Sequence, residues 1–266
     1  MKIARAIQEL EDAKNALGAG RIAYVPTMGA LHEGHLSLVR LAKENADHVI
    51  VSIFVNPTQF APDEDFDSYP RTEEADAALL QAAGADVLFL PTEAVIYPDG
   101  TDCTIVPGDN AQGLEATFRP THFAGVVNVV SRLFDAVKPD VAVFGQKDFQ
   151  QLQVIRQMVD SEAIDIEIIG APIARDEFGL ALSSRNLYLS DEELMIARQF
   201  NVIMRQAARD GDLETAKRAL LEAGFDKVDY IEKRWNRVLG AAWLGKTRLI
   251  DNMAVDEAMD FGACAA

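Results

Sequence analysis

Cysteine is scarce in this chain, with only Cys103 and Cys264 among 266 residues. The two thiols lie far apart in the sequence, so they indicate neither a disulfide framework nor the Cys-x-x-Cys spacing of a metal or redox site. A lack of structural disulfides is typical of proteins in reducing compartments. We therefore expect a cytoplasmic protein.

Long apolar runs are also missing. No stretch approaches the roughly 20 consecutive apolar residues that cross a bilayer. The segment 1–17 carries charges throughout an amphipathic pattern, which predicts a surface helix rather than a signal peptide. We expect no membrane partner.

Positive charge is in short supply, because 25 Lys and Arg residues face 42 Asp and Glu residues and the formal net charge is −17. This balance argues against a general affinity for nucleic acid or for anionic membranes. An anionic ligand must then be bound by a few local cations. The basic residues in glycine-rich or polar loops become the candidates, and the many carboxylates are interpreted as a solvated surface.

Apolar segments rich in β-branched residues alternate with helical patterns through the first two thirds of the chain. The segments are 22–25, 49–55, 87–90, 141–144 and 164–169, and the helices are predicted over 34–45, 72–83, 123–137 and 149–160. Such alternation predicts an α/β fold, a Rossmann-like parallel sheet flanked by helices.

The pattern changes after residue 175. A capping box at Ser190 to Glu193 predicts a long helix through Ala208. A helix over 213–223 and strands over 227–233 and 247–252 complete a small α+β domain, and the tail 261–266 is expected to fray. We place the boundary near residues 175 to 188 and divide the chain into domains 1–177 and 178–266.

The stretch from Pro26 to His35 joins the first of these strands to a helix through a glycine-bearing turn. A helix that starts after such a turn offers unpaired backbone N–H groups and a positive dipole end to an anion. His32 and His35 add ring N–H donors. Their spacing of three differs from the spacing of four in a zinc protease helix. The pattern predicts a nucleotide phosphate site, and two histidines in an ordinary loop are the alternative.

Amide side chains follow the next strand in the sequence Asn56-Pro-Thr-Gln59-Phe. Asn56 and Gln59 offer both donors and acceptors, which suits a small substrate with hydroxyl and carboxylate groups. Asn-Pro is also a common start of a turn, so simple turn chemistry remains the alternative.

Two later loops combine cations with hydroxyl or carboxylate groups. Gly145-Gln-Lys147-Asp148-Phe-Gln-Gln151 offers Lys147 to a phosphate and Asp148 to ribose hydroxyls, or else holds only a surface ion pair. Ser183-Ser184-Arg185-Asn presents a guanidinium suited to bidentate phosphate contacts and two hydroxyl donors, or else serves only as a linker.

Two weaker candidate sites are also present. Arg119 and His122 place a cation and an imidazole before a helix. Asp76 or Glu73 is a candidate ligand of Mg²⁺, although an acidic first turn is equally expected from stabilisation of the helix dipole.

Taken together in this order, the histidine turn, the Asn56 to Phe60 loop, the Gly145 to Gln151 loop and the Ser183 to Asn186 loop resemble the pantoate–β-alanine ligases. The resemblance extends over nearly the whole chain. It implies a nucleotidylyltransferase-type Rossmann-like domain with a small C-terminal α+β lid, ATP and Mg²⁺ as requirements, and a homodimer. The implied reaction condenses pantoate with β-alanine through a pantoyl adenylate, releasing diphosphate and AMP.

The resemblance also implies roles for individual residues. His32 and His35 would stabilise charge at the α-phosphorus; Lys147, Ser183, Ser184 and Arg185 would hold the departing pyrophosphate; Asp148 would contact ribose; Met28, Gly145 and Leu182 would line the nucleotide site; Gln59 and Gln151 would bind pantoate; Asp76 would support Mg²⁺; and Asn56, Arg119 and His122 would complete the pocket.

Some positions depart from the family pattern. Gln146, Phe149 and Leu182 stand where Glu, Tyr and Met are usual, the segment after Gly211 is shorter, and Arg234-Trp-Asn replaces Arg-Asp-Ala. The last two departures leave lid closure in question. A related adenylyltransferase and a nucleotide-binding protein without catalysis remain alternatives. A tRNA synthetase is disfavoured by the charge of −17, and a purely structural protein by the four polar loops.

Overall fold

The structure is a computed structural model that describes residues 1–61 and 64–255. The chain forms two compact units. Unit 1 comprises Met1–Gln146 and Gln150–Pro172, and unit 2 comprises Lys147–Phe149 and the chain from Ile173 onward. The domain boundary at 177/178 stays a prediction.

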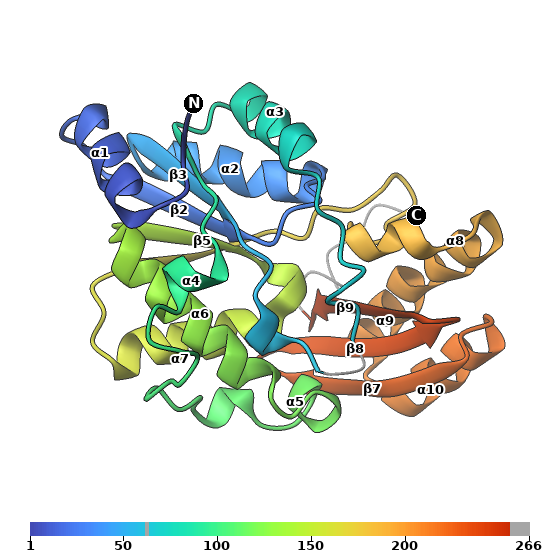
Figure 1. Cartoon of the computed structure of the whole chain (residues 1–266). Coiled ribbons are helices and arrows are strands. Elements are labelled where there is room, and N and C mark those ends of the chain that lie inside the picture. The colour runs from blue at the N-terminus through green and yellow to red at the C-terminus, as the bar shows by residue number, and fades with distance from the viewer. Residues whose placement is uncertain (62–63, 256–266) are drawn as a thin grey trace. The chain divides into compact units, whose positions relative to one another are not determined.

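Unit 1 is built on a six-stranded sheet with the order β1-β4-β3-β2-β5-β6, in which every pair of neighbours is parallel (Figure 1). The strands are β1 (Lys2–Ala4), β2 (Ile22–Thr27), β3 (His48–Ile53), β4 (Val87–Phe89), β5 (Val141–Gly145) and β6 (Glu167–Ala171). The predicted parallel sheet is therefore confirmed. Its central strands β2, β3, β4 and β5 are largely buried on both faces, as their continuous apolar runs indicate.

Helices cover both faces of this sheet (Figure 1). The helices of this unit are α1 (Ile7–Leu17), α2 (Glu33–Asn45), α3 (Glu73–Ala83), α4 (Glu93–Ile96), α5 (Glu115–Phe118), α6 (His122–Val137) and α7 (Phe149–Ser161). Successive residues of a strand point to opposite faces. Ala23 and Val25 accordingly pack in the cluster that holds Leu38 of α2, whereas the ring of Tyr24 contacts Phe134 of α6.

The N-terminal segment differs from its prediction. Residues 1–17 are not one helix, because Lys2–Ala4 form the edge strand β1 and α1 begins at Ile7. Ile3 pairs with Leu88 of β4, so parallel pairing with the sheet overrides the helical pattern. No helix in 1–61 or 64–255 is long and apolar enough to cross a membrane.

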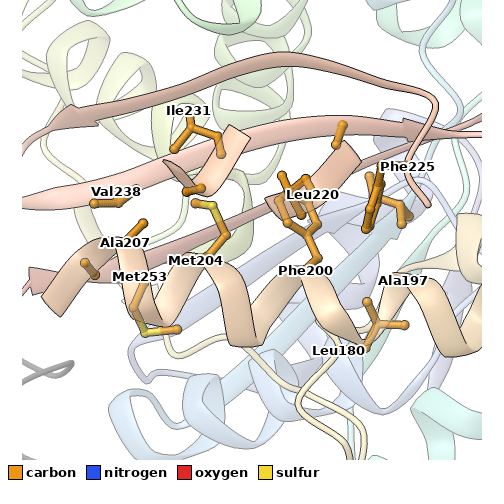
Figure 2. Close-up of a cluster of buried hydrophobic side chains, with 14 of the residues drawn as sticks. Leu180, Ala197, Phe200, Met204, Ala207, Leu220, Phe225, Ile231, Val238 and Met253 are labelled. Carbon is orange, nitrogen blue, oxygen red and sulfur yellow. The ribbon is translucent and has the colours of Figure 1, made fainter. Parts of the chain in front are cut away.

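Unit 2 packs helices against a three-stranded antiparallel sheet. The elements are α8 (Asp191–Ala197), α9 (Gln199–Asp210), α10 (Leu213–Glu222), β7 (Lys227–Arg234), β8 (Arg237–Leu244) and β9 (Thr247–Ala254). Phe200 and Met204 of α9 lie in one apolar cluster with Ile231 and Val238 of the sheet (Figure 2). A Cβ at Gly240 would lie 2.9 Å from the Met204 sulfur, so glycine allows this close packing.

Two predictions for unit 2 were wrong in part. The capping box at Ser190 is present, but the predicted long helix is divided at Arg198, whose guanidinium bonds Asp176 and lies over the Phe178 ring. Strand β8 was not predicted. It follows a two-residue turn in which Trp235 and Asn236 both have positive φ, the geometry that matches the twist of a hairpin. The predicted fraying of 261–266 concerns residues outside the described ranges.

Candidate active site

The order of the sheet in unit 1 reverses between two neighbouring strands, β2 and β5. From β2 the chain continues to β3 on one side, and from β5 it continues to β6 on the other. Open parallel sheets bind ligands beyond the carboxyl ends of the strands at such a switch point. Strand β2 ends at Thr27, directly before the histidine turn, and β5 ends at Gly145. Two of the predicted loops therefore begin at the expected place.

The histidine turn is held in an uncommon backbone conformation. Gly29 and Ala30 have φ of +86° and +51°, so two successive residues are left-handed. For a residue other than glycine this conformation costs about 1–3 kcal/mol. A Cβ at Gly29 would also meet Ile53 at 3.0 Å, which explains glycine at this position.

His32 and His35 lie together at the start of α2, with ring centroids 4.2 Å apart. Nδ1 of His32 accepts from the backbone N–H of Gly34 at 3.1 Å, and Nδ1 of His35 accepts from the backbone N–H of His32 at 3.3 Å. A nitrogen that accepts from an N–H carries no proton. Both rings are therefore neutral with the proton on Nε2, and each has an N–H donor that is suited to an anion.

Asp76 does not fit the predicted role of a magnesium ligand. Its side chain is buried at 2% exposure and accepts from Ala30 N at 3.0 Å, Leu31 N at 2.8 Å and the Thr72 hydroxyl at 3.1 Å. Protein donors thus occupy three of the about four acceptor positions of this carboxylate, which disfavours a further bond to magnesium. In the described part of the chain, no group of three His, Cys, Asp or Glu residues could hold a metal. Glu73, the other candidate, forms an ion pair with Arg5.

Asn56 is also not available to a substrate. It is 1% exposed, its amide oxygen accepts from Thr58 and from the Tyr97 hydroxyl at 2.7 Å, and its amide nitrogen donates to Gln59 and to Gly125 O. These bonds use the whole capacity of the amide. Asn56 therefore holds its own loop in place. This is the turn chemistry that the sequence offered as the alternative to substrate binding.

Gln59 is the residue around which several predicted site residues meet. Its side-chain nitrogen lies 2.9 Å from the Met28 sulfur, and its backbone carbonyl accepts from the His122 ring at 3.0 Å and from Arg119 at 3.4 Å. The loop is seated on the start of α6 at Gly125, where an added Cβ would lie 2.2 Å from Thr58 O. Glycine at 125 therefore sets the position of Gln59.

Arg119 and His122 are two basic groups that both contact the Gln59 carbonyl, and His122 is buried while Arg119 is partly buried. Arg119 makes a bidentate contact with Glu64, at 2.5 and 2.8 Å. Burial alone would raise the pKa of Glu64, but the hydrogen bonds and charge of Arg119 lower it overall. Burial, together with the charge of Arg119, lowers the pKa of His122 to about 4. Since Nδ1 of His122 donates to a carbonyl, its Nε2 is an acceptor.

In unit 2, Ser183, Ser184 and Arg185 lie at the start of a 3₁₀ turn over Ser184–Tyr188, where the Ser183 hydroxyl accepts from Arg185 N at 3.3 Å. Leu182 bonds through its N–H to Ala174 O at 2.9 Å. The base of the loop is fixed by Arg175, which makes two contacts with the buried Asp251 at 2.7 and 2.9 Å.

Lys147 and Asp148 belong to unit 2, although they follow β5 directly. The carbonyl of Lys147 accepts from the Asn252 amide at 3.0 Å, and Asn252 in turn bonds Arg237, whose guanidinium lies over the Phe149 ring. This fixes the backbone of the segment. The candidate site residues are thus divided between unit 1 and unit 2. Gln151, in unit 1, lies half-buried in the first turn of α7.

Gln150 was missed by sequence reasoning. It is 2% exposed, its amide nitrogen donates to the carbonyls of Asn110, Gln112 and Gly113, and its oxygen accepts from Glu115 N at 2.9 Å. Its position in line with the apolar residues of α7 was the available signal. A polar residue on such a face requires internal partners.

Comparisons with known proteins agree with this architecture. Residues 2–254 match the family model described as pantoate-beta-alanine ligase. A pantothenate synthetase of Mesorhizobium japonicum is 53% identical, over 88% of this chain and 90% of the relative. One from Rhizorhabdus wittichii is 50% identical, over 97% of this chain and 100% of the relative.

Solved structures give the same result. A Francisella tularensis pantoate-beta-alanine ligase, complexed with beta-gamma ATP and beta-alanine, has a TM-score of 0.89 and 42% identity, covering 96% of this chain and 98% of that one. A Thermus thermophilus pantothenate synthetase has a TM-score of 0.86 and 40% identity, covering 96% and 99%. The fold, the histidine turn and these matches lead to one conclusion: the chain belongs to the pantoate–β-alanine ligase family.

Proposed function

We propose that this enzyme condenses pantoate with β-alanine at the expense of ATP, giving pantothenate, AMP and diphosphate by way of a pantoyl adenylate. The observation that carries the proposal is the pair of histidines at the start of α2, whose Nδ1 atoms accept from backbone N–H groups. Each places a proton on Nε2, and the helix start adds backbone N–H groups and a positive dipole end. Phosphoryl chemistry depends on such positioned donors more than on a protein nucleophile.

In the first step a carboxylate oxygen of pantoate attacks the α-phosphorus of ATP, and the bond to the bridging oxygen of diphosphate breaks. His32 and His35 donate to the α-phosphate oxygens, where negative charge accumulates in the transition state. Gln59 and Gln151 bind pantoate, since an amide can donate to a carboxylate and accept from a hydroxyl. Met28 lies against Gln59 and limits the same pocket.

The residues of unit 2 hold the leaving group and the nucleoside. Lys147, Ser183, Ser184 and Arg185 bind the diphosphate through charge-assisted and hydroxyl hydrogen bonds. Asp148, an exposed carboxylate, accepts from ribose hydroxyls. Gly145 and Leu182 complete the nucleotide site as backbone and apolar contacts. The requirement for Mg²⁺ rests on the family resemblance, and Asp76 does not fit the metal.

In the second step the neutral amine of β-alanine attacks the acyl carbon of the adenylate. The bond between that carbon and the AMP oxygen breaks, AMP leaves with the bonding electron pair, and the amine nitrogen loses a proton to water. Arg119 and His122 line this part of the pocket, where His122 offers an acceptor at Nε2. A cytoplasmic location and a homodimer are retained as proposals that rest on the family resemblance.

The test is release of AMP and diphosphate by purified protein with ATP, Mg²⁺, D-pantoate and β-alanine, with each carbon substrate omitted in turn. We expect AMP in turnover quantities only when both are present. We also expect pantoate alone to support exchange of labelled diphosphate into ATP. AMP release that does not depend on pantoate would refute the proposal.

A further inference from the structure

The carboxylate of Asp76, once it is set aside as a metal ligand, is a buried charge without a role in the reaction. It lies in the first turn of α3, and its two oxygens bond successive N–H groups of the histidine turn. Oδ1 accepts from Leu31 N at 2.8 Å, and Oδ2 accepts from Ala30 N at 3.0 Å. A buried charge is retained when such charge-assisted bonds compensate its desolvation.

These two bonds coincide with the strained part of the turn. Ala30, at φ +51°, follows Gly29, at φ +86°, and the N–H groups of Ala30 and Leu31 then point to one carboxylate. A left-handed residue other than glycine persists only when its surroundings impose that conformation. The next residue after Leu31 is His32, which begins the exchange of cap bonds with His35.

We propose that Asp76 is a positioning residue for the two histidines. It fixes the backbone at Ala30 and Leu31, and thereby the direction in which His32 leaves the turn and the bonds that set both ring tautomers. The proposal deepens the proposed function and rests on it, because it assumes that His32 and His35 act at the α-phosphate. An asparagine at 76 would turn an amide N–H₂ toward one of the two backbone donors, so it cannot reproduce both bonds.

The decisive measurement is a ¹⁵N–¹H spectrum of the imidazole rings in metal-free, ATP-free protein. The chain has four histidines, so His48→Gln and His122→Gln suffice to separate the signals of the pair. In the wild type we expect both rings of the pair in the Nε2–H form. In Asp76→Asn we expect at least one of them to lose it. Unchanged tautomers in the variant overturn the proposal, whatever happens to the rate.

Steady-state kinetics give the functional half of the test. Displacement of a catalytic group by about 1 Å commonly costs on the order of 10²-fold in rate, and we expect a loss of that size in kcat for Asp76→Asn. A changed tautomer with normal kcat also overturns the proposal. A Mg²⁺ ligand would behave differently: the half-saturating Mg²⁺ concentration would rise roughly tenfold or more while the metal-free spectrum stayed that of the wild type.

Glu74→Gln is the matched control, because it removes an exposed carboxylate from the same helical turn. We expect it to leave the tautomers, kcat and the Mg²⁺ dependence unchanged. Thr72→Val is the second variant in case Asp76→Asn fails to fold. It removes only the hydroxyl that bonds Oδ2, and we expect a smaller loss in the same direction. A wild type without ligase activity would refute the proposed function, while the spectra would still decide whether Asp76 sets the tautomers.

Discussion

The side-chain oxygen of Gln150 accepts a 2.9 Å hydrogen bond from the backbone N–H of Glu115, directly after a residue with left-handed φ, Leu114. The amide nitrogen of Gln150 donates hydrogen bonds to three backbone carbonyls of the same loop. One side chain thus orders the connection that leads to α5 and Arg119.

Replacing Gln150 should therefore destabilise the protein. We expect Gln150→Ala to lower the free energy of unfolding by about 2–4 kcal/mol, because it removes a buried bond to the N–H of Glu115 and the donor to three part-buried carbonyls. Urea unfolding measures the change. Gln153→Ala, one turn later on α7 and half-buried, should cost less than about 0.5 kcal/mol. If the two substitutions lowered the free energy of unfolding equally, Gln150 would not be the residue that orders this loop.

His122 should make stability depend on pH. Its pKa is lowered from 6.5 to about 4 in the folded state, so between these values the unfolded chain binds a proton that the folded chain does not. Stability then falls as pH decreases from about 6.5 to about 4. We expect the wild type to lose about 2 kcal/mol more than His122→Gln between pH 7 and pH 5. If the free energy of unfolding changed with pH to the same extent in the two proteins, this prediction would be refuted.

Gly125→Ala should disturb substrate binding from outside the pocket. The new Cβ would lie 2.2 Å from Thr58 O, so the loop that carries Gln59 must move. Overpacking of this kind costs about 1–3 kcal/mol. We expect lower stability together with a raised KM for pantoate, measured by diphosphate exchange. Ala124→Ser, at an exposed neighbouring position of α6, should change neither quantity.

The ion pair of Arg175 with Asp251 should be required for the stability of unit 2. Asp251 is buried, and its removal takes the charged partner from Arg175, which keeps its bonds to the carbonyls of Gly179 and Asn252 at the base of the Ser183 loop. We expect Asp251→Ala to cost about 3–5 kcal/mol and to weaken ATP binding, as measured by unfolding and calorimetry. Glu214→Gln breaks the exposed pair with Lys217 and should cost less than about 1 kcal/mol. Retained stability in the first variant would contradict this account.

Periodicity and turn chemistry were sufficient for much of the fold. The alternation of apolar segments predicts the parallel sheet, and the spacing of His32 and His35 after a glycine turn predicts their meeting at a helix start. Strand β8 was not predicted, because its turn, Trp235-Asn236, lacks the glycine that usually indicates a tight hairpin.

The side chains were harder to assign than the elements. Asn56 has the same chemistry whether it meets a substrate or its own loop, and only burial separates the two. The first turn of α3 carries Glu73, Glu74 and Asp76, and the sequence does not tell which carboxylate turns inward. Such choices depend on contacts between residues far apart in the chain.

The assignment of Lys147–Phe149 to unit 2 has a consequence for modularity. The chain passes between the units at 146/147, 149/150 and 172/173, so no single cut separates them. A fragment that starts at residue 173 would lack the Lys147 carbonyl that Asn252 bonds and the Phe149 ring beneath Arg237. The C-terminal unit is therefore not an interchangeable cassette, and chimaeras between relatives should exchange 147–149 along with it.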